Sequence, residues 1–376
     1  MDKLVVGIFG KINSGKSTLV NSLAKENVSI VSDVRGSTSD CVSKMTEIDG
    51  IGRVQLIDCA GYDDDGLLAG QRLAGVQKAF DMSDIAIIVC KEEFDKLDKI
   101  WIEKCAERNK KYILCHNVIG TAQVKTKNNE LWIDVACEQG ANAIIQMIKQ
   151  LSSVTEIDIL GDLVNACDNV LLCMPQDDGA PNGRLILPQS IVIRAIIDKG
   201  GVPIIAKKEN FGDMFEKFKN DISLVITDSS VFDYVYNIAG GIVPITSFSV
   251  LFAKKNGDIN VFVNGANSID SLSDGDKILI MEACSHTLSH KDIGSVLIPG
   301  LLKKYTGKNL VFEIVRGKDE PKDWSQFKLV VHCGGCTQNR QFMLARIQKC
   351  EKYNLPITNY GILLAKLKGI LAKIVY

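Results

Sequence analysis

The feature that most restricts the fold of this chain is an octapeptide between an apolar run and a helical pattern. Residues 4–9 are almost entirely apolar, which is typical of a buried strand. The segment that follows fits the pattern G-x-x-x-x-G-K-S/T completely: Gly10-Lys11-Ile12-Asn13-Ser14-Gly15-Lys16-Ser17. In such a loop the backbone wraps around phosphates, and the next helix presents its positive end. A strand, this loop and a helix in sequence predict a parallel α/β sheet with a phosphate site at its edge.

The residue types in this loop each have a chemical reason. Lys16 is expected to contact the β- and γ-phosphates of a nucleotide, and the hydroxyl of Ser17 is expected to hold Mg²⁺. We therefore interpret Lys16 as catalytic. The expected nucleotide-binding residues of the loop are Gly10, Asn13, Ser14, Gly15, Lys16, Ser17 and Thr18.

Strand and helix patterns alternate along the whole chain, which predicts α/β domains with mainly parallel sheets. In the first part, further strands are expected at residues 54–57, 85–89 and 112–115, and a helix near 142–151. Leu97, Ile100, Trp101 and Cys105 recur at helical spacing and predict one apolar face of a crossover helix.

The same alternation starts again twice. Strands are expected at 170–174, 202–206 and 224–227 in a second unit, and at 277–281, 310–315 and 328–331 in a third. Expected helices cover 189–198, 211–218, 232–238, 293–305, 340–353 and a stretch from about residue 360. We expect three domains, at residues 1–153, 154–260 and 261–376.

Charge and cysteine usage exclude several classes of protein. The net charge is −1, with 44 basic and 45 acidic residues, which argues against a nucleic-acid binder. The 12 cysteines are spread thinly and lie mostly in apolar runs, and no leader pattern is recognised. We therefore expect a reducing, cytoplasmic location. The longest uncharged run, residues 234–253, is broken by Gly, Pro and Ser, so we predict a helix, a turn and a buried strand and no membrane span.

Two further segments lie in order behind the loop. Asp58-Cys59-Ala60-Gly61 follows a predicted strand as D-x-x-G, and Thr38 stands in the segment Gly36-Ser37-Thr38-Ser39-Asp40. Together with the loop they resemble the translation-factor-like GTPases, closest to the tRNA-modification type. This resemblance implies that Asp58 binds Mg²⁺ through water, that the Gly61 N–H contacts the γ-phosphate and that Thr38 completes the metal shell. With Lys16, we expect Thr38 and Asp58 to be the catalytic residues. It also implies that Asn13 helps to bind K⁺, which would stimulate hydrolysis.

The guanine-reading segments depart from that resemblance. The family pattern N-K-x-D is replaced by Asn117-Val118-Ile119-Gly120, so Asn117 is kept while Gly120 stands in place of the carboxylate. The later turn, Val135-Ala136-Cys137, is also degenerate. The segment after Gly61 has no obvious Gln to orient the attacking water. Asp63, Asp64 and Asp65 stand there instead, and we interpret them mainly as a solvated acidic loop. We expect relaxed base specificity and slow hydrolysis.

Thiols and imidazoles gather in two short segments near the end of the chain, each behind a predicted strand. These are Cys284-Ser285-His286 and His332-Cys333-Gly334-Gly335-Cys336. Cys-x-x-Cys with glycines between suits a thiolate site for iron–sulfur or Zn²⁺. A redox pair, a structural Cys₃His zinc site and buried core thiols remain open alternatives. His290 reads as a loop residue, and Cys350 as a core residue beside Met343 and Ile347.

C-x-H followed by H-C-x-x-C behind a GTPase domain resembles the [FeFe]-hydrogenase H-cluster maturation GTPases, the HydF family. Further segments that resemble this family are residues 183–189, 227–229, 339–340 and 356–361. The resemblance implies a [4Fe-4S] cluster bound by Cys284, Cys333 and Cys336, with His286 and His332 as possible further ligands. It implies a carrier of the diiron precursor, which is delivered to the apo-hydrogenase. It also implies radical S-adenosylmethionine maturases as partners and a homodimer formed through the middle domain; whether dimers pair into tetramers stays open.

Two other functions stay open from the residues alone. One is an RNA-modification GTPase with a zinc-stabilised last domain, which the near-neutral charge opposes. The other is an interaction protein with an inactive nucleotide site, which the intact Lys16 and Ser17 oppose.

Overall fold

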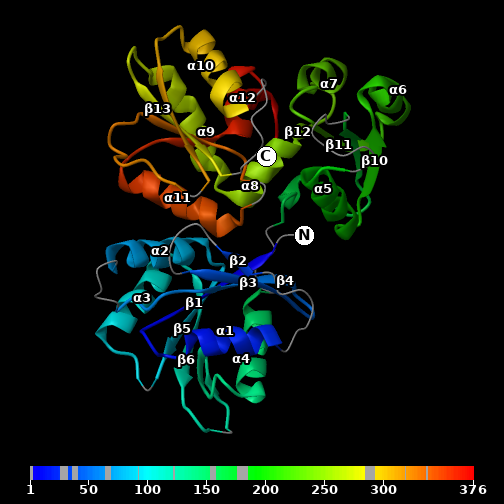
Figure 1. Ribbon diagram of the computed structural model, residues 1–376. Coiled ribbons are helices and arrows are strands. Elements are labelled where there is room, and N and C mark those ends of the chain that lie inside the picture. Colours follow the sequence, from blue (N-terminus) through cyan, green and yellow to red (C-terminus); the bar gives the residue numbers. More distant parts are fainter. Residues whose placement is uncertain are drawn as a thin grey trace. The chain divides into compact units, whose positions relative to one another are not determined.

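The structure is a computed structural model that describes residues 3–25, 33–35, 41–63, 69–91, 93–121, 123–152, 158–175, 185–283, 293–317, 319–335 and 338–376. The chain forms two compact units, residues 1–156 and 157–376 (Figure 1). Each unit is described by itself below.

The first unit is built on one sheet in the order β2-β3-β4-β1-β5-β6-β8-β7. Its five central strands are parallel: β4 (Gly52–Asp58), β1 (Leu4–Gly10), β5 (Ile85–Cys90), β6 (Lys111–Asn117) and β8 (Glu130–Ile133). Antiparallel strands extend both sides: β3 (Val42–Ile48) and β2 (Asp33–Arg35) beyond β4, and β7 (Lys125–Lys127) beyond β8. The expected α/β architecture is confirmed.

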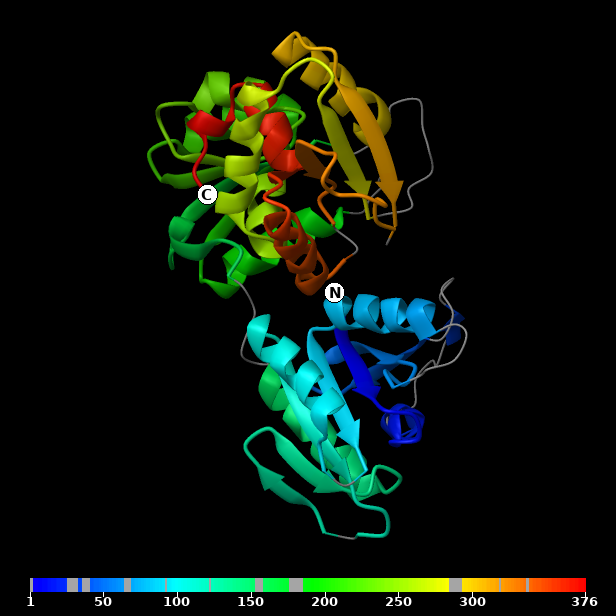
Figure 2. The ribbon, with the colours of Figure 1, turned by 90° about the vertical axis from the view of Figure 1, so that its left-hand side faces the viewer.

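Helices cover both faces of this sheet (Figure 2). α1 (Lys16–Lys25) and α4 (Glu138–Ser152) pack on one face, and α2 (Ala69–Met82) and α3 (Lys96–Glu107) pack on the other. The predicted apolar face of α3 is partly wrong, because Leu97 and Ile100 are exposed. The buried stripe is Asp98, Trp101 and Cys105, and Asp98 is stabilised there by a hydrogen bond from Tyr62. The prediction used apolar residues alone, so it assigned Leu97 and Ile100 to the buried face and missed the polar residue Asp98 there.

The second unit contains two all-parallel sheets. The first has the order β10-β9-β11-β12, with β10 (Val202–Ala206), β9 (Asn169–Cys173), β11 (Ile222–Thr227) and β12 (Ile245–Ser247). The other has the order β14-β13-β15-β16, with β14 (Val311–Arg316), β13 (Lys277–Glu282), β15 (Leu329–His332) and β16 (Ile357–Asn359).

The helices of the second unit lie on both faces of these sheets. α5 (Leu187–Asp198) and α8 (Phe248–Asn256) pack on one face of the first sheet, and α6 (Lys208–Phe218) and α7 (Phe232–Ala239) pack on the other. α10 (Ile298–Thr306) and α12 (Tyr360–Leu367) cover one face of the second sheet, and α9 (Ile259–Asn267) and α11 (Arg340–Lys352) cover its opposite face. Short helical turns complete the chain: Gly161–Leu163, Ser268–Ser271, Ile293–Leu297 and Leu371–Lys373.

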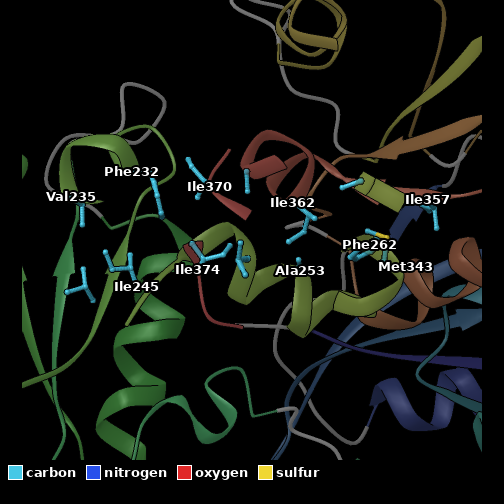
Figure 3. Packing of buried hydrophobic residues seen from close by; sticks show 14 of the residues in the cluster. Phe232, Val235, Ile245, Ala253, Phe262, Met343, Ile357, Ile362, Ile370 and Ile374 are labelled. Atoms are coloured by element: carbon cyan, nitrogen blue, oxygen red, sulfur yellow. The ribbon is translucent and has the colours of Figure 1, made fainter. Parts of the chain in front are cut away.

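One hydrophobic cluster runs through both sheets of the second unit. Figure 3 shows it extending from Val235 and Ile245 at one end to Met343 and Ile357 at the other, with Ala253 of α8 between them. Burial of apolar surface is the main stabilising term in folding. The two parts of this unit therefore depend on each other for much of their core.

The uncharged run at residues 234–253 was predicted as a helix, a turn and a buried strand. The structure has these in α7 and β12, but the strand ends at Ser247 and the chain continues as α8. The hydroxyl of Ser247 accepts a hydrogen bond from the Val250 N–H and so caps that helix. Among the described residues, no helix combines the length and the apolar character that a membrane crossing requires.

Candidate nucleotide site and cysteine–histidine loops

The phosphate loop leaves the carboxyl end of β1, in the middle of the first sheet. Two of its residues must be glycine. At Gly10 (φ +152°) a Cβ would lie 2.3 Å from the Val89 carbonyl oxygen, and at Gly15 (φ +106°) it would lie 2.4 Å from the Asn117 amide nitrogen. The loop therefore sits tightly against β5 and β6, and α1 begins directly behind it at Lys16. The N-terminal N–H groups of a helix attract anions.

Lys16 is buried in this loop, and its ammonium group donates a hydrogen bond to the Lys11 carbonyl. Burial lowers the pKa of Lys16, while the negative charges of Asp58 and Asp63 oppose that change. A buried cation with such a weak acceptor is well placed to exchange it for phosphate oxygens.

Asp58 ends β4 beside Ser17, and burial raises the pKa of its carboxyl group. A hydrogen bond with Ser17 and the charge of Lys16 act in the opposite direction. Among the described residues, neither Asp58 Oδ1 nor the buried hydroxyl of Ser14 has a hydrogen-bond partner. Buried polar atoms are normally satisfied, so these two fit a site that is completed by a hydrated Mg²⁺ and a nucleotide.

The segment behind Asp58 contacts the phosphate loop directly. Asp63 Oδ1 accepts a hydrogen bond of 2.7 Å from the Ile12 N–H, and a Cβ on Gly61 would lie 2.6 Å from the same nitrogen. Gly61 is thus next to the loop, as the predicted γ-phosphate contact requires. Thr38, Asp64 and Asp65 lie outside the described residues.

Asn117 joins the end of β6 to the loop. Its amide nitrogen donates to the Ser14 carbonyl at 3.0 Å, and its amide oxygen accepts from the Val135 N–H at 3.3 Å. The side chain therefore holds the phosphate loop and the turn after β8 together. Asn13 and Thr18 are exposed on the loop and on α1.

A network behind the loop was missed in the sequence. Lys11 forms an ion pair with Asp95, which caps α3 in a capping box with Asp98. Asp98 in turn accepts a hydrogen bond from the Tyr62 hydroxyl, and burial, together with this contact, raises the pKa of Tyr62. The spacing D-x-x-D before a helix was the available signal for the cap. No local sequence pattern indicated that Lys11 and Tyr62 contact these two aspartates.

In the second unit, the loops behind β13 and β15 meet. The Ala283 N–H donates a hydrogen bond of 3.1 Å to Cys333 Sγ, and Ala283 directly precedes Cys284 in the chain. The Cys333 N–H donates to the Met281 carbonyl, and Asn256 donates to the Gly334 carbonyl at 3.1 Å. Neighbouring parallel strands therefore bring Ala283, behind β13, and Cys333, behind β15, to one edge of the sheet. Cys284, His286, His290 and Cys336 lie outside the described residues.

His332 does not offer a ligand atom in this arrangement. It is fully buried at the end of β15, its Nδ1–H donates to the Cys333 carbonyl at 2.6 Å, and its Nε2 accepts from the Arg346 guanidinium at 2.8 Å. Burial lowers the pKa of Arg346 to about 10. Metal binding by His332, which the sequence offers as a possibility, would require loss of the Arg346 hydrogen bond.

Cys350 lies on the buried face of α11 with Met343 and Ile347, as predicted, and burial raises its pKa to about 12. Among the described residues, no group of three or more His, Cys, Asp or Glu side chains could hold a metal ion. Cys333 Sγ still accepts a backbone N–H, the type of hydrogen bond made to cluster-bound sulfur. The part of the site that is described thus fits a thiolate ligand.

Comparison with protein families divides the chain into three matched regions. Residues 5–118 match the 50S ribosome-binding GTPase model, residues 159–257 match the hydrogen maturase F dimerization domain, and residues 260–376 match the hydrogen maturase F tetramerization domain.

The curated relatives named GTPase Der and MnmE are similar to the GTPase domain alone. GTPase Der of Wolinella succinogenes is 42% identical over 99 residues, which are 25% of this chain and 21% of that protein. The tRNA modification GTPase MnmE of Finegoldia magna is 37% identical over 123 residues, which are 31% of this chain and 26% of that protein. The chain thus spans about a fifth to a quarter of the length of the curated relatives it matches.

Among solved structures, the chain is similar to the G domain of the T. maritima FeoB iron transporter, with 19% identity, a TM-score of 0.30 and coverage of 40% of this chain and 99% of that one. It is also similar to Aquifex aeolicus Era bound to GDP and AlF₄⁻, with 15% identity, a TM-score of 0.27 and coverage of 84% and 94%.

Proposed function

Because the chain belongs to the hydrogen maturase F family, whose two characteristic domains match more than half of its residues, we propose that it is a GTP-hydrolysing scaffold of hydrogenase maturation. In this proposal the first domain binds GTP and Mg²⁺. The last domain carries a [4Fe-4S] cluster and the diiron precursor of the [FeFe]-hydrogenase active site, and the protein delivers that precursor to the apo-hydrogenase.

The arrangement around Lys16 carries the nucleotide part of the proposal. Lys16 neutralises the β- and γ-phosphates. The Ser17 hydroxyl holds Mg²⁺ directly, Asp58 holds it through water, and the Gly61 N–H contacts the γ-phosphate. Thr38 completes the metal shell. Hydrolysis is slow, because the residue directly after Gly61 is Tyr62 and not a Gln that could orient the attacking water. Asn13 supplies an oxygen to K⁺.

The contact between Ala283 and Cys333 supports the cluster part, because Ala283 directly precedes Cys284 in the chain and its N–H donates to Cys333 Sγ. Cys284, Cys333 and Cys336 are the proposed thiolate ligands, and His286 remains a candidate for a fourth. When bound, a cluster with three protein ligands supplies one iron that can bind a further group. Arg346 donates a hydrogen bond to His332, and its positive charge acts on Cys333, one of the proposed ligands.

Self-association and partners complete the proposal. Val202 and Ile205 are about half exposed on β10, an edge strand of its sheet, which favours pairing of two copies. We propose a homodimer through residues 154–260 and tetramer formation through residues 261–376. Radical S-adenosylmethionine maturases and the apo-hydrogenase are the proposed partners, and nucleic acid is not.

An RNA-modification GTPase with a structural zinc site is the alternative. The likeness to MnmE favours it but is confined to the GTPase domain. Both domains behind it match hydrogen maturase F instead.

The deciding experiment is a count of iron, acid-labile sulfide and zinc per chain on protein purified and reconstituted without oxygen. We expect about four irons and four sulfides, with a brown absorption band that Cys333→Ser removes. Cys167→Ser is the matched control, because Cys167 is an exposed cysteine of the same unit that precedes β9, a strand of the other sheet.

One tightly bound zinc without sulfide would contradict the proposal and favour the RNA-modification alternative. Iron content that stays the same in Cys333→Ser would remove the proposed ligand set.

A further inference from the structure

The proposed nucleotide site lacks, in the loop after β6, the carboxylate that is expected to recognise the base. Guanine presents two N–H donors, on N1 and on the exocyclic N2, which a carboxylate accepts together. Gly120 stands where that carboxylate is expected and has no side chain to supply it. We propose that Asp134, from the end of β8, supplies the carboxylate that reads guanine. This inference rests on the proposed binding of GTP.

The strand order places Asp134 on the correct edge. β1, β5, β6 and β8 are neighbours in that order, all parallel, so their carboxyl ends lie along one edge of the sheet. The phosphate loop follows β1, and Asp134 directly follows β8, three strand spacings or roughly 14 Å away. Ligands of such sheets lie across this edge. A nucleotide with its phosphates on the loop extends toward Asp134.

The turn that follows Asp134 is attached to the phosphate loop and its helix. The Val135 N–H donates to Asn117, whose amide group donates to the Ser14 carbonyl. The Val135 carbonyl accepts a hydrogen bond of 2.9 Å from the Ser22 hydroxyl on α1. Asp134 is therefore held in a fixed position relative to the phosphate-binding backbone, as base recognition requires.

The carboxylate of Asp134 lies against the backbone of the incomplete motif. Oδ2 accepts a hydrogen bond of 2.8 Å from the Gly120 N–H, and Oδ1 accepts one of 2.9 Å from the Ala136 N–H. The side chain is half-buried. Each carboxylate oxygen can accept about two hydrogen bonds. Both oxygens therefore keep capacity for one N–H of the base.

The rest of Asp134 is immobilised as well. Its carbonyl accepts from the Cys137 N–H at 3.2 Å, and α4 approaches so closely that a Cβ on Gly140 would lie 2.2 Å from the same oxygen. Val118, partly exposed in the adjoining loop, offers an apolar surface for the face of a purine ring. A carboxylate held rigidly next to an apolar surface is a suitable reader of the guanine edge.

The test measures dissociation constants of the full-length protein for GTP, ITP, XTP and ATP with Mg²⁺. We expect GTP to bind best, and ITP, which lacks the exocyclic amino group, to bind more weakly. Asp134→Asn replaces one acceptor by a donor, which suits xanthine. It should weaken GTP binding roughly 10- to 100-fold, the range that a bidentate base contact supplies, and should strengthen XTP binding.

Glu138→Gln is the matched control, because it removes a nearby exposed charge at the start of α4 and should leave all four constants unchanged. An equal loss for all four nucleotides in Asp134→Asn would identify Asp134 as a purely structural cap and overturn the inference. Wild-type protein that binds none of the four would overturn the proposed function itself, and the inference with it.

A second variant keeps the inference testable if Asp134→Asn does not fold. Gly120→Asp places a carboxylate at the expected position. No described atom obstructs a Cβ there, and the backbone has φ +80°, a left-handed conformation that Asp tolerates better than most residues. If Asp134 already reads the base, this variant gains little affinity for GTP, since the two carboxylates repel each other. A tenfold gain or more would show that the reading carboxylate is absent from the wild type, and would overturn the inference.

Discussion

At the scale of single residues, Asn13 allows the proposed K⁺ site to be tested cleanly. Its backbone has φ +60°, which Asn and Gly tolerate better than other residues. Asn13→Gly therefore removes the amide oxygen and keeps the loop conformation. We expect wild-type hydrolysis to be several-fold faster in K⁺ than in Na⁺, and Asn13→Gly to lose this difference, measured as phosphate release at matched ionic strength.

Equal wild-type rates in the two salts would remove K⁺ from the proposed function. A difference that persists in Asn13→Gly would instead assign the K⁺ ligand to another residue.

Residue roles that depend on neighbours in the sequence could be predicted, and those that depend on folding could not. Lys16, Ser17 and Gly15 share one short loop whose chemistry is local. The sequence did not indicate that Asp134 recognises the base, because its contact with Gly120 joins the loops behind two different strands, β6 and β8. The hydrogen bond between Arg346 and His332 could not be predicted either, because the two residues meet only when α11 packs on β15.

At the scale of elements, α9 packs on β16 through a glycine. A Cβ on Gly265 would lie 2.0 Å from the Ile357 carbonyl oxygen, and that oxygen belongs to backbone that cannot rotate away. Gly265→Ala must push the helix off the strand. We expect a loss of about 1–3 kcal/mol in the free energy of unfolding, as for other overpacked sites, measured by urea denaturation.

Gly300→Ala is the control for this change. Gly300 also lies in a helix of the second unit, but a Cβ there meets no described atom within 4 Å. It should raise the free energy of unfolding by about 0.5–1 kcal/mol, since Ala is the better helix former. Equal effects of the two substitutions would show that close contact at Gly265 does not determine the packing of α9.

Elements with a strong apolar pattern were predicted well, and short ones were not. β10 was predicted with its observed bounds, since five mostly apolar residues stand between turns. β16 has only three residues, and α9 carries Asn and Gly at positions that a helix seldom prefers, so neither has a clear pattern. Both are stabilised by packing against each other, which propensity does not report.

At the scale of the whole molecule, the shared cluster predicts how the second unit unfolds. A fragment of residues 157–376 keeps the entire cluster of Figure 3 and should fold and unfold cooperatively. A fragment of residues 159–257 loses Phe262, Ile362 and Ile374 from that cluster. We expect it to lack fixed tertiary packing, measured as loss of near-ultraviolet circular dichroism with retained helix signal.

A short fragment with the same midpoint and steepness of urea unfolding as the long one would contradict this expectation. It would mean that the core of the first sheet of this unit is sufficient by itself.

The shared cluster also has a consequence for synthesis of the chain on the ribosome. β12 is an edge strand, and the Ile245 carbonyl there accepts a hydrogen bond of 2.9 Å from the Val375 N–H, while Ile370 and Ile374 join the core. These partners are translated about 130 residues after Ile245, a delay of roughly 7–26 s at about 5–20 residues per second. During that interval the apolar side of α7 and α8 is open to water. Nascent chains of this protein therefore present a binding surface for chaperones that the finished protein no longer has.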